Sequence, residues 1–557
     1  MKTIFTSLAM LFCASLFAQP GALDPGFGSN GVYKAPDTTM GKYGDISAVK
    51  LLPDGKMIIA GSSNFGRAYA FLDLYIARLN ANGTLDSSFG TAGRTVVDFA
   101  TDSDNLHISD DIAANLSLQT DGKIVVSCTV KLYPQGSGNG SDIGVVRLNA
   151  DGSFDNSFNG TGKKRINITT AANPYLDGEN CSGVAIRSNG KIVLGGYTFN
   201  QAPKTFQSDI DALLIQLNGN GSFDNTFGSN GVQVFTKRGT DEYINSIALQ
   251  SDNKLVLAGN TGTANVTTAN NILLIRTLPS GALDKTFNSV GYTTTDIQNK
   301  SADFGTDVTL QTDGKIVVGA YINPGEGAVQ NFLLRYNANG KPDATFGTKG
   351  KAFIDSSSTF FYTTTSLSLT TDGKIVQTTS RFSVYRVNTN GSRDASFGTN
   401  GKVSLYADPY KTWQCFASAV QPDNKIVAVG LDQFSLGRNG SGYTELAVRL
   451  LGSAQNSIAN RAEEGLRESK LSAVTASVSN IVMYPNPSRS AFAIVVKSGD
   501  NNIISLRISD ASGRLIEAIS GVRTGETKQF GAGYMPGTYY VEIVQGNQHK
   551  TVKLVKL

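Results

Sequence analysis

Residues 85–93 read Leu-Asp-Ser-Ser-Phe-Gly-Thr-Ala-Gly, and variants of this phrase occur seven times in the 557-residue chain. Each copy has an Asp, a Phe three residues later and a Gly seven residues later, and successive copies lie 51 to 69 residues apart. A recurrence at that length indicates a repeat architecture. The seven Asp residues are Asp24, Asp86, Asp155, Asp224, Asp284, Asp343 and Asp394.

Two further landmarks recur between the copies. The first is Asp-Gly-Lys or a variant with Asn, followed by an apolar run, as at residues 54–59. Asp-Gly and Asn-Gly between apolar runs favour a tight β-hairpin, because these residues accept positive φ at low cost. The second is Arg-Leu-Asn, as at residues 78–80, which leads through a Gly turn into the next phrase. The landmarks thus predict four short antiparallel strands in each unit, and seven such units predict an all-β, seven-bladed β-propeller.

The array is cut out of phase at its two ends. The chain opens with a phrase at residue 23 that has no Arg-Leu-Asn segment before it, and the last such segment, at residues 448–450, has no phrase after it. We therefore expect the strand around residues 31–33 to complete the last blade, which would remove exposed sheet edges. The alternative is an open β-solenoid, which usually has shorter rungs and atypical caps.

The N-terminus and the domain order predict an exported protein. Residues 1–18 resemble a signal peptide, with Lys2, an apolar stretch and the small residue Ala18. A lipoprotein signal at Cys13 is the less favoured alternative. Residues 19–451 form the repeat region, residues 452–479 read as a flexible linker without aromatic residues, and residues 480–557 contain seven predicted short strands that imply a β-sandwich.

Charge and hydropathy argue against a nucleic-acid partner and against a transmembrane helix. Lys and Arg number 49 against 45 Asp and Glu, and most of the excess lies in residues 480–557. The repeat region therefore has no basic footprint for nucleic acid. After residue 18 no segment approaches the roughly 18 apolar residues of a transmembrane helix. We expect a monomer without a transmembrane helix or a nucleic-acid partner.

The seven units resemble the delta-60 repeat family of bacterial exported proteins. The resemblance covers residues 22–451 and rests on both repeated phrases, in order, in every unit. Asn159 and Asn288 replace the first Gly of the phrase, and Pro342 and Arg393 replace its Leu. The resemblance implies the propeller fold but no ligand.

Residues 480–557 contain an ordered set of motif residues, namely Tyr484, Pro485, Asn486, Pro487, Gly513, Gly537, Tyr539, Lys553 and Lys556. On this set the segment resembles the C-terminal sorting domain of type IX secretion in Bacteroidota. The resemblance implies passage through the outer membrane by the type IX secretion machinery. After passage the domain is usually cleaved, and the protein is released or held at the cell surface.

The repeated residues favour structural roles. A residue present in every blade answers a need that every blade shares, and we expect each Asp to accept backbone N–H groups within its turn. The repeated Phe residues are expected to wedge between blades. Of the three cysteines after residue 18, Cys181 and Cys415 occupy equivalent strand positions, which favours small buried side chains over a disulfide or a reactive thiol for these two.

Function is expected in the segments that do not repeat. Four loops of unequal length, at residues 65–75, 133–142, 199–211 and 434–443, mix aromatic residues with Asn, Gln and Gly. Such side chains suit a glycan or a protein ligand. The candidate binding residues are Tyr69, Phe71, Tyr133, Phe199, Phe206, Phe434 and Tyr443.

Metal and catalytic signals are sparse. The chain has only two histidines, His107 and His549, in different domains, which excludes histidine-rich zinc or copper sites. No cofactor is expected; weak calcium candidates are residues 102–104 and 209–211, which lack a full loop signature. The leading hypothesis is a non-enzymatic binding propeller, and the alternative is a secreted glycosidase or lyase with carboxylates at the central channel. A passive structural surface protein is a third possibility.

Overall fold

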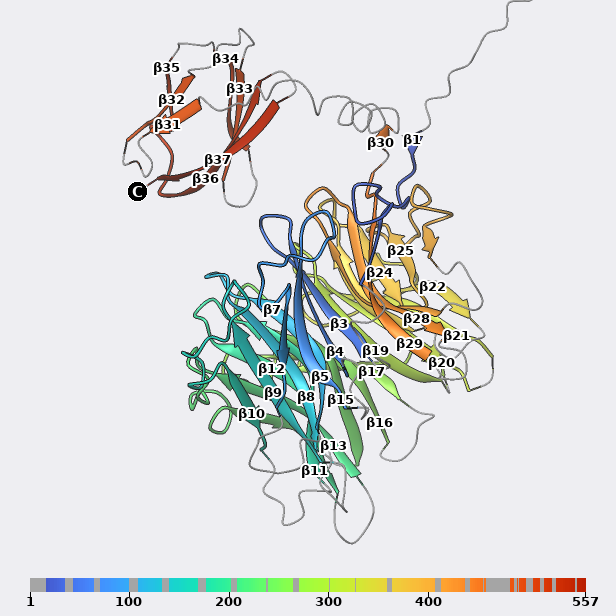
Figure 1. Cartoon of the computed structure of the whole chain (residues 1–557). Helices are drawn as coiled ribbons and strands as arrows, with labels where there is room; N and C mark the ends of the chain where they lie inside the picture. Colours follow the sequence, from blue (N-terminus) through green and yellow to red (C-terminus); the bar gives the residue numbers. More distant parts are fainter. Residues whose placement is uncertain are drawn as a thin grey trace, which may run out of the picture. The chain divides into compact units, whose positions relative to one another are not determined.

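The computed structural model describes two compact units, Met1–Ser457 and Ile458–Leu557. The described residues are 17–35, 44–64, 71–99, 109–132, 140–168, 177–201, 208–236, 239–263, 270–299, 301–325, 327–357, 363–405, 412–435, 441–453, 455–456, 481–484, 488, 490–496, 504–510, 515–522, 527–545 and 548–556. Every regular element in these ranges is a strand, so the expectation of an all-β chain is confirmed (Figure 1).

The N-terminal unit consists of four-stranded antiparallel sets. The first is β3 (Gly44–Leu51), β4 (Met57–Ser63), β5 (Asp73–Leu79) and β6 (Arg94–Val97). The second is β7 (Ser109–Leu118), β8 (Ile124–Leu132), β9 (Ser141–Leu148) and β10 (Lys163–Ile166). The third is β11 (Asp177–Ile186), β12 (Ile192–Gln201), β13 (Ser208–Leu217) and β14 (Val232–Phe235). One parallel pairing, Gly178 with Ser141, joins the second and third sets into a single sheet.

The remaining sets are separate sheets with the same order. The fourth is β15 (Thr240–Leu249), β16 (Leu255–Thr263), β17 (Asn271–Thr277) and β18 (Tyr292–Thr295). The fifth is β19 (Ala302–Leu310), β20 (Ile316–Asn323), β21 (Val329–Tyr336) and β22 (Lys351–Ser357). The sixth is β23 (Thr364–Leu369), β24 (Ile375–Thr379), β25 (Ser383–Val387) and β26 (Lys402–Ser404). The seventh is β27 (Thr412–Val420), β28 (Ile426–Ser435), β29 (Ser441–Leu450) and β2 (Val32–Lys34).

The seventh set contains a strand from the start of the chain. Strand β2 pairs antiparallel with β29, with Val32 opposite Val448. A separate two-stranded sheet pairs β1 (Phe17–Ala18) with β30 (Gln455–Asn456). Each of the first six sets is a simple meander, and no sheet among the described residues closes on itself.

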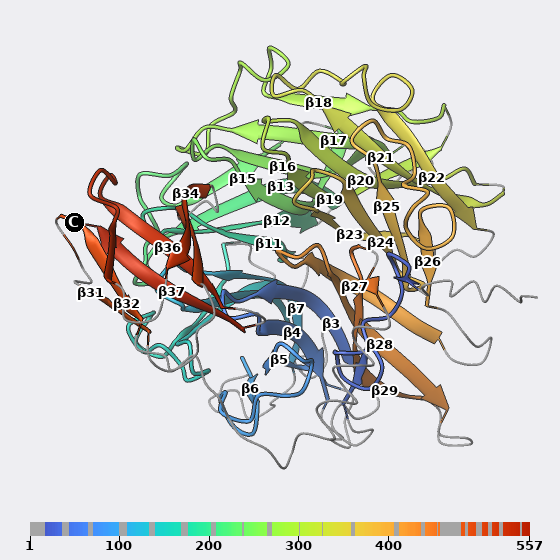
Figure 2. The same ribbon diagram turned by 90° about the horizontal axis from the view of Figure 1, so that it is seen from above.

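The first strands of the sets are neighbours. β3 contacts β7 and β27, and the others follow in chain order from β7 to β27 (Figure 2). Each first strand carries a β-bulge, as between Ile244 and Ser246 of β15. The hydrophobic cores lie between sets: one cluster joins Val49 and Ile59 of the first set with Val427 and Val429 of the seventh. Interset packing of this kind suits strands whose two faces are both apolar.

The repeated sequence phrases form the turns of each set. The Asp-Gly-Lys phrase makes the hairpin between the first and second strands, where Gly55 has φ +84°. In the two copies that lack this Gly, Asn253 and Asn424 adopt φ +64° and +63°. The seven repeated Phe side chains are fully buried. The ring of Phe27 lies directly over Gly83 of the first set, where a Cβ atom would approach the ring to 2.7 Å.

The C-terminal unit contains two sheets that share one core. One sheet has the order β31 (Ile481–Tyr484), β32 (Phe492–Val496) and β35 (Thr527–Phe530). The other has the order β34 (Leu515–Val522), β33 (Ile504–Asp510), β36 (Gly537–Gln545) and β37 (Gln548–Lys556). Buried residues of both sheets form a single cluster that includes Phe492, Phe530, Leu506 and Val541, as in a β-sandwich.

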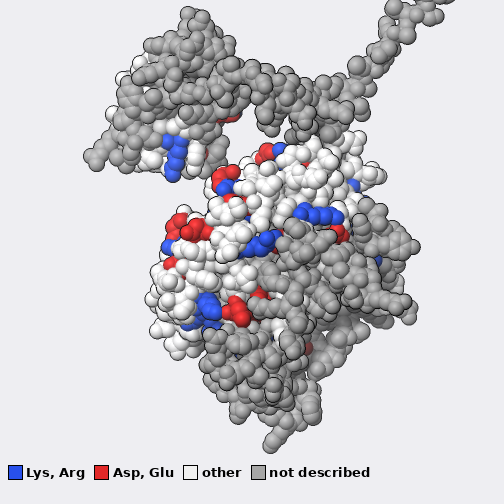
Figure 3. Space-filling model, in the orientation of Figure 1, with Lys and Arg blue, Asp and Glu red and all other residues white. Residues whose placement is uncertain are grey.

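Among the described residues, no helix is long and apolar enough to span a membrane. Lys and Arg are interspersed with Asp and Glu on the described surface shown in Figure 3.

Candidate functional site: an aromatic cleft beside a central cavity

Each repeated Asp forms a contact between neighbouring sets together with an Arg, a Lys and the repeated Phe, and we call this group of residues a joint. In the fifth set, Asp343 Oδ1 accepts the N–H and hydroxyl of Thr345 at 3.0 and 2.7 Å. Its Oδ2 accepts Arg335 Nε at 2.8 Å, and Lys315 of the hairpin lies 3.9 Å away. The Arg335 guanidinium stacks on Phe346, 4.5 Å from the ring centroid, and its Nη1 donates to the carbonyl of Thr389 in the sixth set.

This arrangement recurs with little change. The Arg that bonds the repeated Asp also donates to a backbone carbonyl of the next set, and for Arg386 this carbonyl belongs to Gly452, after β29. The donor and acceptor pairs are Arg78 with Ala150, Arg147 with Gly219, Arg276 with Ala338, Arg386 with Gly452 and Arg449 with Ala81. The last pair links the seventh set to the first. The joint thus serves packing, and the carboxylates are already saturated with donors.

One joint departs from the pattern. In the third set Gln216 stands where the other sets have Arg, and it donates to Asp224. Arg187, which occupies the position of Gln in other hairpins such as Gln250, donates to Gln216 and to the carbonyls of Asn253 and Pro279. The two residue types are exchanged, and the link to the fourth set is kept.

The joints keep their carboxylates ionised. Burial opposes ionisation of Asp284, but hydrogen bonds from Thr286 and Lys254 and the charge of Arg276 outweigh it and lower the pKa of Asp284 to about 2. The Lys56 and Ser88 hydrogen bonds likewise lower the pKa of Asp86. Carboxylates held in this way are poor general acids or bases at neutral pH.

A cavity of about 500 Å³ lies where the first strands of all seven sets meet. Its lining is rich in Ser, Thr and Asn, and it contains two charged residues among those described, Lys50 and Asp307. Asp307 accepts Ser246 Oγ at 2.7 Å and the N–H groups of Val308 and Leu367 at 2.8 and 2.7 Å. Burial raises the pKa of Asp307 and lowers the pKa of Lys50, while each charge partly offsets the shift of the other.

An aromatic cleft of about 500 Å³ lies beside this cavity, and Asn245 and Thr306 line both. The other lining residues are Tyr197, Tyr243, Asn260, Asn270, Phe304 and Tyr321. Tyr197 meets Tyr243 edge to face at 5.1 Å, and Phe304 stacks on Tyr321 at 4.8 Å.

The cleft keeps polar atoms beside its rings. Asn245 Nδ2 donates to Gly305 O at 2.7 Å and to Asn260 Oδ1 at 3.3 Å. Burial, together with the charge of Asp241, raises the pKa of Tyr243 to about 12, and burial also raises the pKa of Tyr197 and Tyr321. The hydroxyls are therefore protonated at neutral pH and can donate hydrogen bonds.

The cleft is built from cross-strand pairs at one register. Tyr321 pairs with Phe304, and Asn260 with Tyr243. The equivalent pair of the first set is Ser62 with Asp45, and that of the second is Thr129 with Ile112. The equivalent pair of the seventh set is Leu431 with Gln414. The four aromatic residues of the cleft thus come from the third, fourth and fifth sets. The sequence-based candidates lie in the loops and do not include these strand positions, although an alignment of the units at the bulge shows them.

The structure describes the side chains of three of the seven candidate loop residues. Tyr69, Tyr133 and Phe206 lie outside the described residues, and the side chain of Phe434 on β28 is also outside them. Phe71, Phe199 and Tyr443 are half-buried, and none of them lines the cleft. Phe199 packs over Gly178, and Tyr443 packs against the core between the first and seventh sets.

The cysteines are buried and unpaired. Cys128, Cys181 and Cys415 are all free thiols. Burial raises the pKa of Cys181 to about 11 and that of Cys415 to about 12, so both are inert as nucleophiles at neutral pH. The interpretation of Cys181 and Cys415 as small buried strand residues agrees with this geometry.

The sorting-domain residues differ in environment. Pro485, Asn486, Pro487, Gly513 and the side chain of Tyr484 lie outside the described residues. Gly537 and Lys553 are exposed, whereas Tyr539 is buried and its hydroxyl donates to Met535 O at 2.8 Å. Lys556 is buried, and its Nζ donates to the carbonyls of Ser490, Gly531 and Ala532. Within the basic terminus, Lys556 is therefore buried and bonded to backbone carbonyls, whereas Lys553 is exposed.

Comparison with protein families finds two matches. Residues 52–89, 119–158, 187–227, 250–287, 311–346 and 370–397 match a domain of unknown function described as the DUF5122 beta-propeller. Residues 482–557 match the secretion system C-terminal sorting domain. The resemblances to a propeller repeat family and to a type IX sorting domain are thus confirmed, and the sorting domain points to an exported protein, secreted or held at the outer-membrane surface. No curated protein sequence matches the chain.

Solved structures show only distant likeness. A protein of unknown function from Dyadobacter fermentans DSM 18053 is 10% identical with a TM-score of 0.35, covering 75% of this chain and 99% of its own. YCF48 bound to D1 peptide is 9% identical with a TM-score of 0.37, covering 78% and 97%. A GH43 endo-arabinanase from Bacillus licheniformis is 13% identical with a TM-score of 0.27, covering 55% and 98%. Sequence identities and TM-scores this low support no inference about function.

Proposed function

We propose that this protein is an exported, seven-bladed β-propeller, closed by its own N-terminal strand, that binds a glycan in the aromatic cleft without turning it over. The observation that carries the proposal is the cleft itself, where four aromatic rings and three Asn side chains from neighbouring sets converge.

Several contacts support ring closure. Strand β2 completes the seventh set, Arg449 of that set bonds Asp24 at 2.7 Å, and its Nη1 donates to Ala81 O of the first set at 2.6 Å. The residues in contact are 368 to 425 positions apart in sequence. First strands of all seven sets also line one cavity. A ring of blades explains these contacts better than an open solenoid, which would leave its two ends apart.

The chemistry of the cleft favours a sugar. Pyranose rings present apolar C–H faces and a rim of hydroxyls, so they suit half-buried aromatic rings with amide groups beside them. Tyr243 and Tyr321 offer ring faces and hydroxyl donors, and Asn245 and Asn260 offer amide groups. A few placed polar groups within an apolar lining is the general pattern of ligand sites.

The central cavity supports binding over two-carboxylate hydrolysis. Glycosidases of the usual kind need a pair of carboxyl groups about 5 to 10 Å apart. Among the described lining residues Asp307 is the one carboxylate, and its oxygens already accept three hydrogen bonds. We therefore propose a binding protein.

The test is a glycan and polysaccharide array probed with the full-length protein, followed by titration calorimetry and a turnover assay on each hit. Phe304→Ala and Tyr243→Ala should weaken binding of a hit at least about tenfold, because losing an aromatic ring that the ligand buries costs on the order of 1.5–3 kcal/mol. Phe353→Ala is the matched control, because Phe353 is 53% exposed on β22 and lies outside the cleft. An array without hits, or hits that ignore both cleft variants, would contradict the proposal.

The export route has a separate test. We propose that deletion of residues 480–557 leaves the protein in the periplasm, since the sorting domain implies the type IX machinery. Surface display of the truncated protein, measured by protease shaving of intact cells, would contradict that route.

A further inference from the structure

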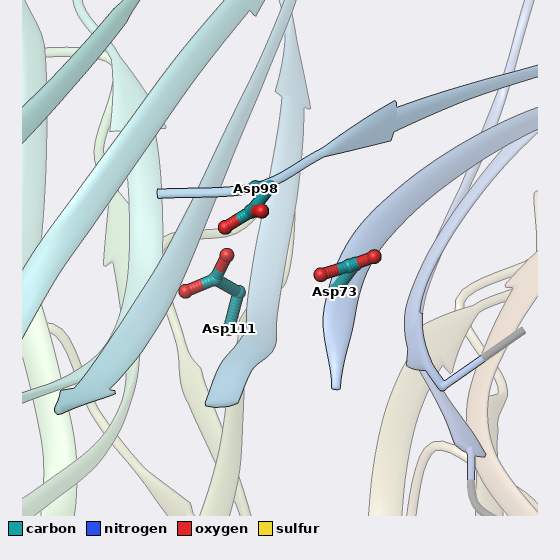
Figure 4. A group of neighbouring side chains, drawn as sticks. All are labelled: Asp73, Asp98 and Asp111. Carbon is teal, nitrogen blue, oxygen red and sulfur yellow. The ribbon is translucent and has the colours of Figure 1, made fainter. Parts of the chain in front are cut away.

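Three carboxylates converge between the first and second sets. Asp73 comes from β5, Asp98 follows β6, and Asp111 comes from β7 (Figure 4). One oxygen of each lies within 4.8 Å of the other two. Asp73 and Asp111 are buried and Asp98 is half-buried. Like charges this close and this buried disfavour each other's ionised form unless a cation balances them.

Asp111 has a buried oxygen that accepts no hydrogen bond. Its side chain is fully buried, and its Oδ2 accepts the Phe99 N–H at 2.8 Å. Its Oδ1 has no donor in hydrogen-bonding geometry among the described residues, and the hydroxyl of neighbouring Ser109 is likewise without a partner in that geometry. Figure 4 shows the Asp111 carboxylate pointing toward that of Asp98. A bare carboxylate oxygen away from water is costly.

The neighbouring position between the second and third sets provides a comparison. There the Ile168 N–H donates to Glu179 Oε1 at 3.2 Å, as Phe99 does to Asp111. The acid on the third strand, Asp142, accepts Arg165 Nε on one oxygen and Asn167 Nδ2, at 3.0 Å, on the other. Protein donors therefore balance the acids at that position.

Both of those donors are replaced between the first and second sets. Counted from the repeated Asp86 and Asp155, Val96 stands in place of Arg165 and Asp98 in place of Asn167. One cation and one amide are thus exchanged for an apolar side chain and a third carboxylate. The Nζ of Lys163 donates to the backbone carbonyl of Asp98.

We propose that Asp73, Asp98 and Asp111 bind a Ca²⁺ ion that joins the first two sets. Carboxylate oxygens are hard ligands, and Ca²⁺ holds oxygens at about 2.3–2.6 Å, so two of its ligands lie up to about 5 Å apart. The three oxygens meet that limit. Mg²⁺ requires about 2.0–2.1 Å and near-octahedral geometry, which suits these separations less well.

This site differs from the calcium candidates in the sequence. Residues 102–104 lie outside the described residues, and so does the side chain of Asp209. The proposal is also independent of the glycan cleft, which involves the third to fifth sets.

The test uses full-length protein treated with a chelator and then titrated with CaCl2 or MgCl2, with binding heat and thermal unfolding as readouts. Millimolar CaCl2 should raise the midpoint by at least about 3 °C, because an ion that binds only the folded state stabilises it. MgCl2 should give a smaller shift. No heat and no shift with CaCl2 would overturn the proposal, and an equal shift with MgCl2 would overturn the choice of calcium.

Two variants locate the effect. Val96→Arg/Asp98→Asn copies the donors of the next position, so it should unfold no earlier than the parent in chelator and lose the CaCl2 shift. Asp303→Asn is the matched control, because Asp303 is the equivalent buried acid of the fifth set and lies outside the cluster. It should keep the shift. A full shift in the double variant, or a lost shift in the control, would place the ion elsewhere and overturn this site.

Discussion

The joints and the aromatic cleft lie at opposite ends of the same strands, and they differ in what repeats. At the hairpin ends, Asp, Arg, Lys and Phe recur from set to set, and even the exchanged pair Arg187 and Gln216 preserves the contact. At the other ends, Tyr243 and Phe304 have no aromatic counterpart in the first or second set. Residues that repeat from set to set therefore serve packing, and residues that depart from the repeat serve specific roles.

Breaking a joint should have the largest effect on stability. Arg335→Met leaves the Asp343 carboxylate, which is 4% exposed, without its main partner, so the free energy of unfolding should fall by about 3–5 kcal/mol. Lys315→Met is the matched control in the same joint, because Lys315 is 29% exposed and 3.9 Å from Asp343. It should cost less than about 1 kcal/mol in urea denaturation. Equal losses would contradict the role given to Arg335.

The exchanged joint allows a double-mutant cycle. Arg187→Gln removes the guanidinium that spans to the fourth set and should cost about 2–3 kcal/mol. Adding Gln216→Arg recreates the residue pattern of the other sets and should restore most of that loss, giving a coupling energy above about 1 kcal/mol. Additive effects of the two substitutions would show that the pair is not an equivalent joint.

Acid should weaken the joints together. The repeated Asp residues have folded-state pKa values below their ordinary value, so their stabilisation is present above about pH 4 and is lost as the pH falls through the folded values, about 2 for Asp284. Asp45 acts in the opposite sense, because burial raises its pKa to about 6. Its contribution to stability is present below about pH 4 and is lost as the pH rises to about 6. The unfolding midpoint should therefore drop steeply between pH 4 and 2. In Asp284→Asn that drop should be shallower, and an unchanged slope would contradict the assignment.

Loop aromatics should matter least. Phe71→Ala and Tyr443→Ala should change glycan affinity less than about twofold, because neither side chain lines the cleft. A tenfold loss in either variant, measured by the calorimetry used for Phe304→Ala, would move the binding site from the strands to the loops.

Much of the fold follows from the sequence because its signals are local. The Asp-Gly-Lys turns and the apolar runs place the hairpins, and the out-of-phase phrase at Asp24 anticipates the bond to Arg449. The joint itself was not predicted, since the Arg449 contact with Ala81 spans 368 residues and depends on the packing of neighbouring sets. The cleft was missed for another reason: its rings sit within regular strands, where the alternating pattern looks like core.

The most direct test of the central claim compares Asp284→Asn with Phe304→Ala on one glycan found by the array, measuring dissociation constant and unfolding free energy for each. We predict that Asp284→Asn loses stability by about 2 kcal/mol while its dissociation constant stays within about twofold. Phe304→Ala should instead raise the dissociation constant at least about tenfold. A folded Asp284→Asn protein that no longer binds the glycan would contradict the account, because the repeated phrase would then be part of the site.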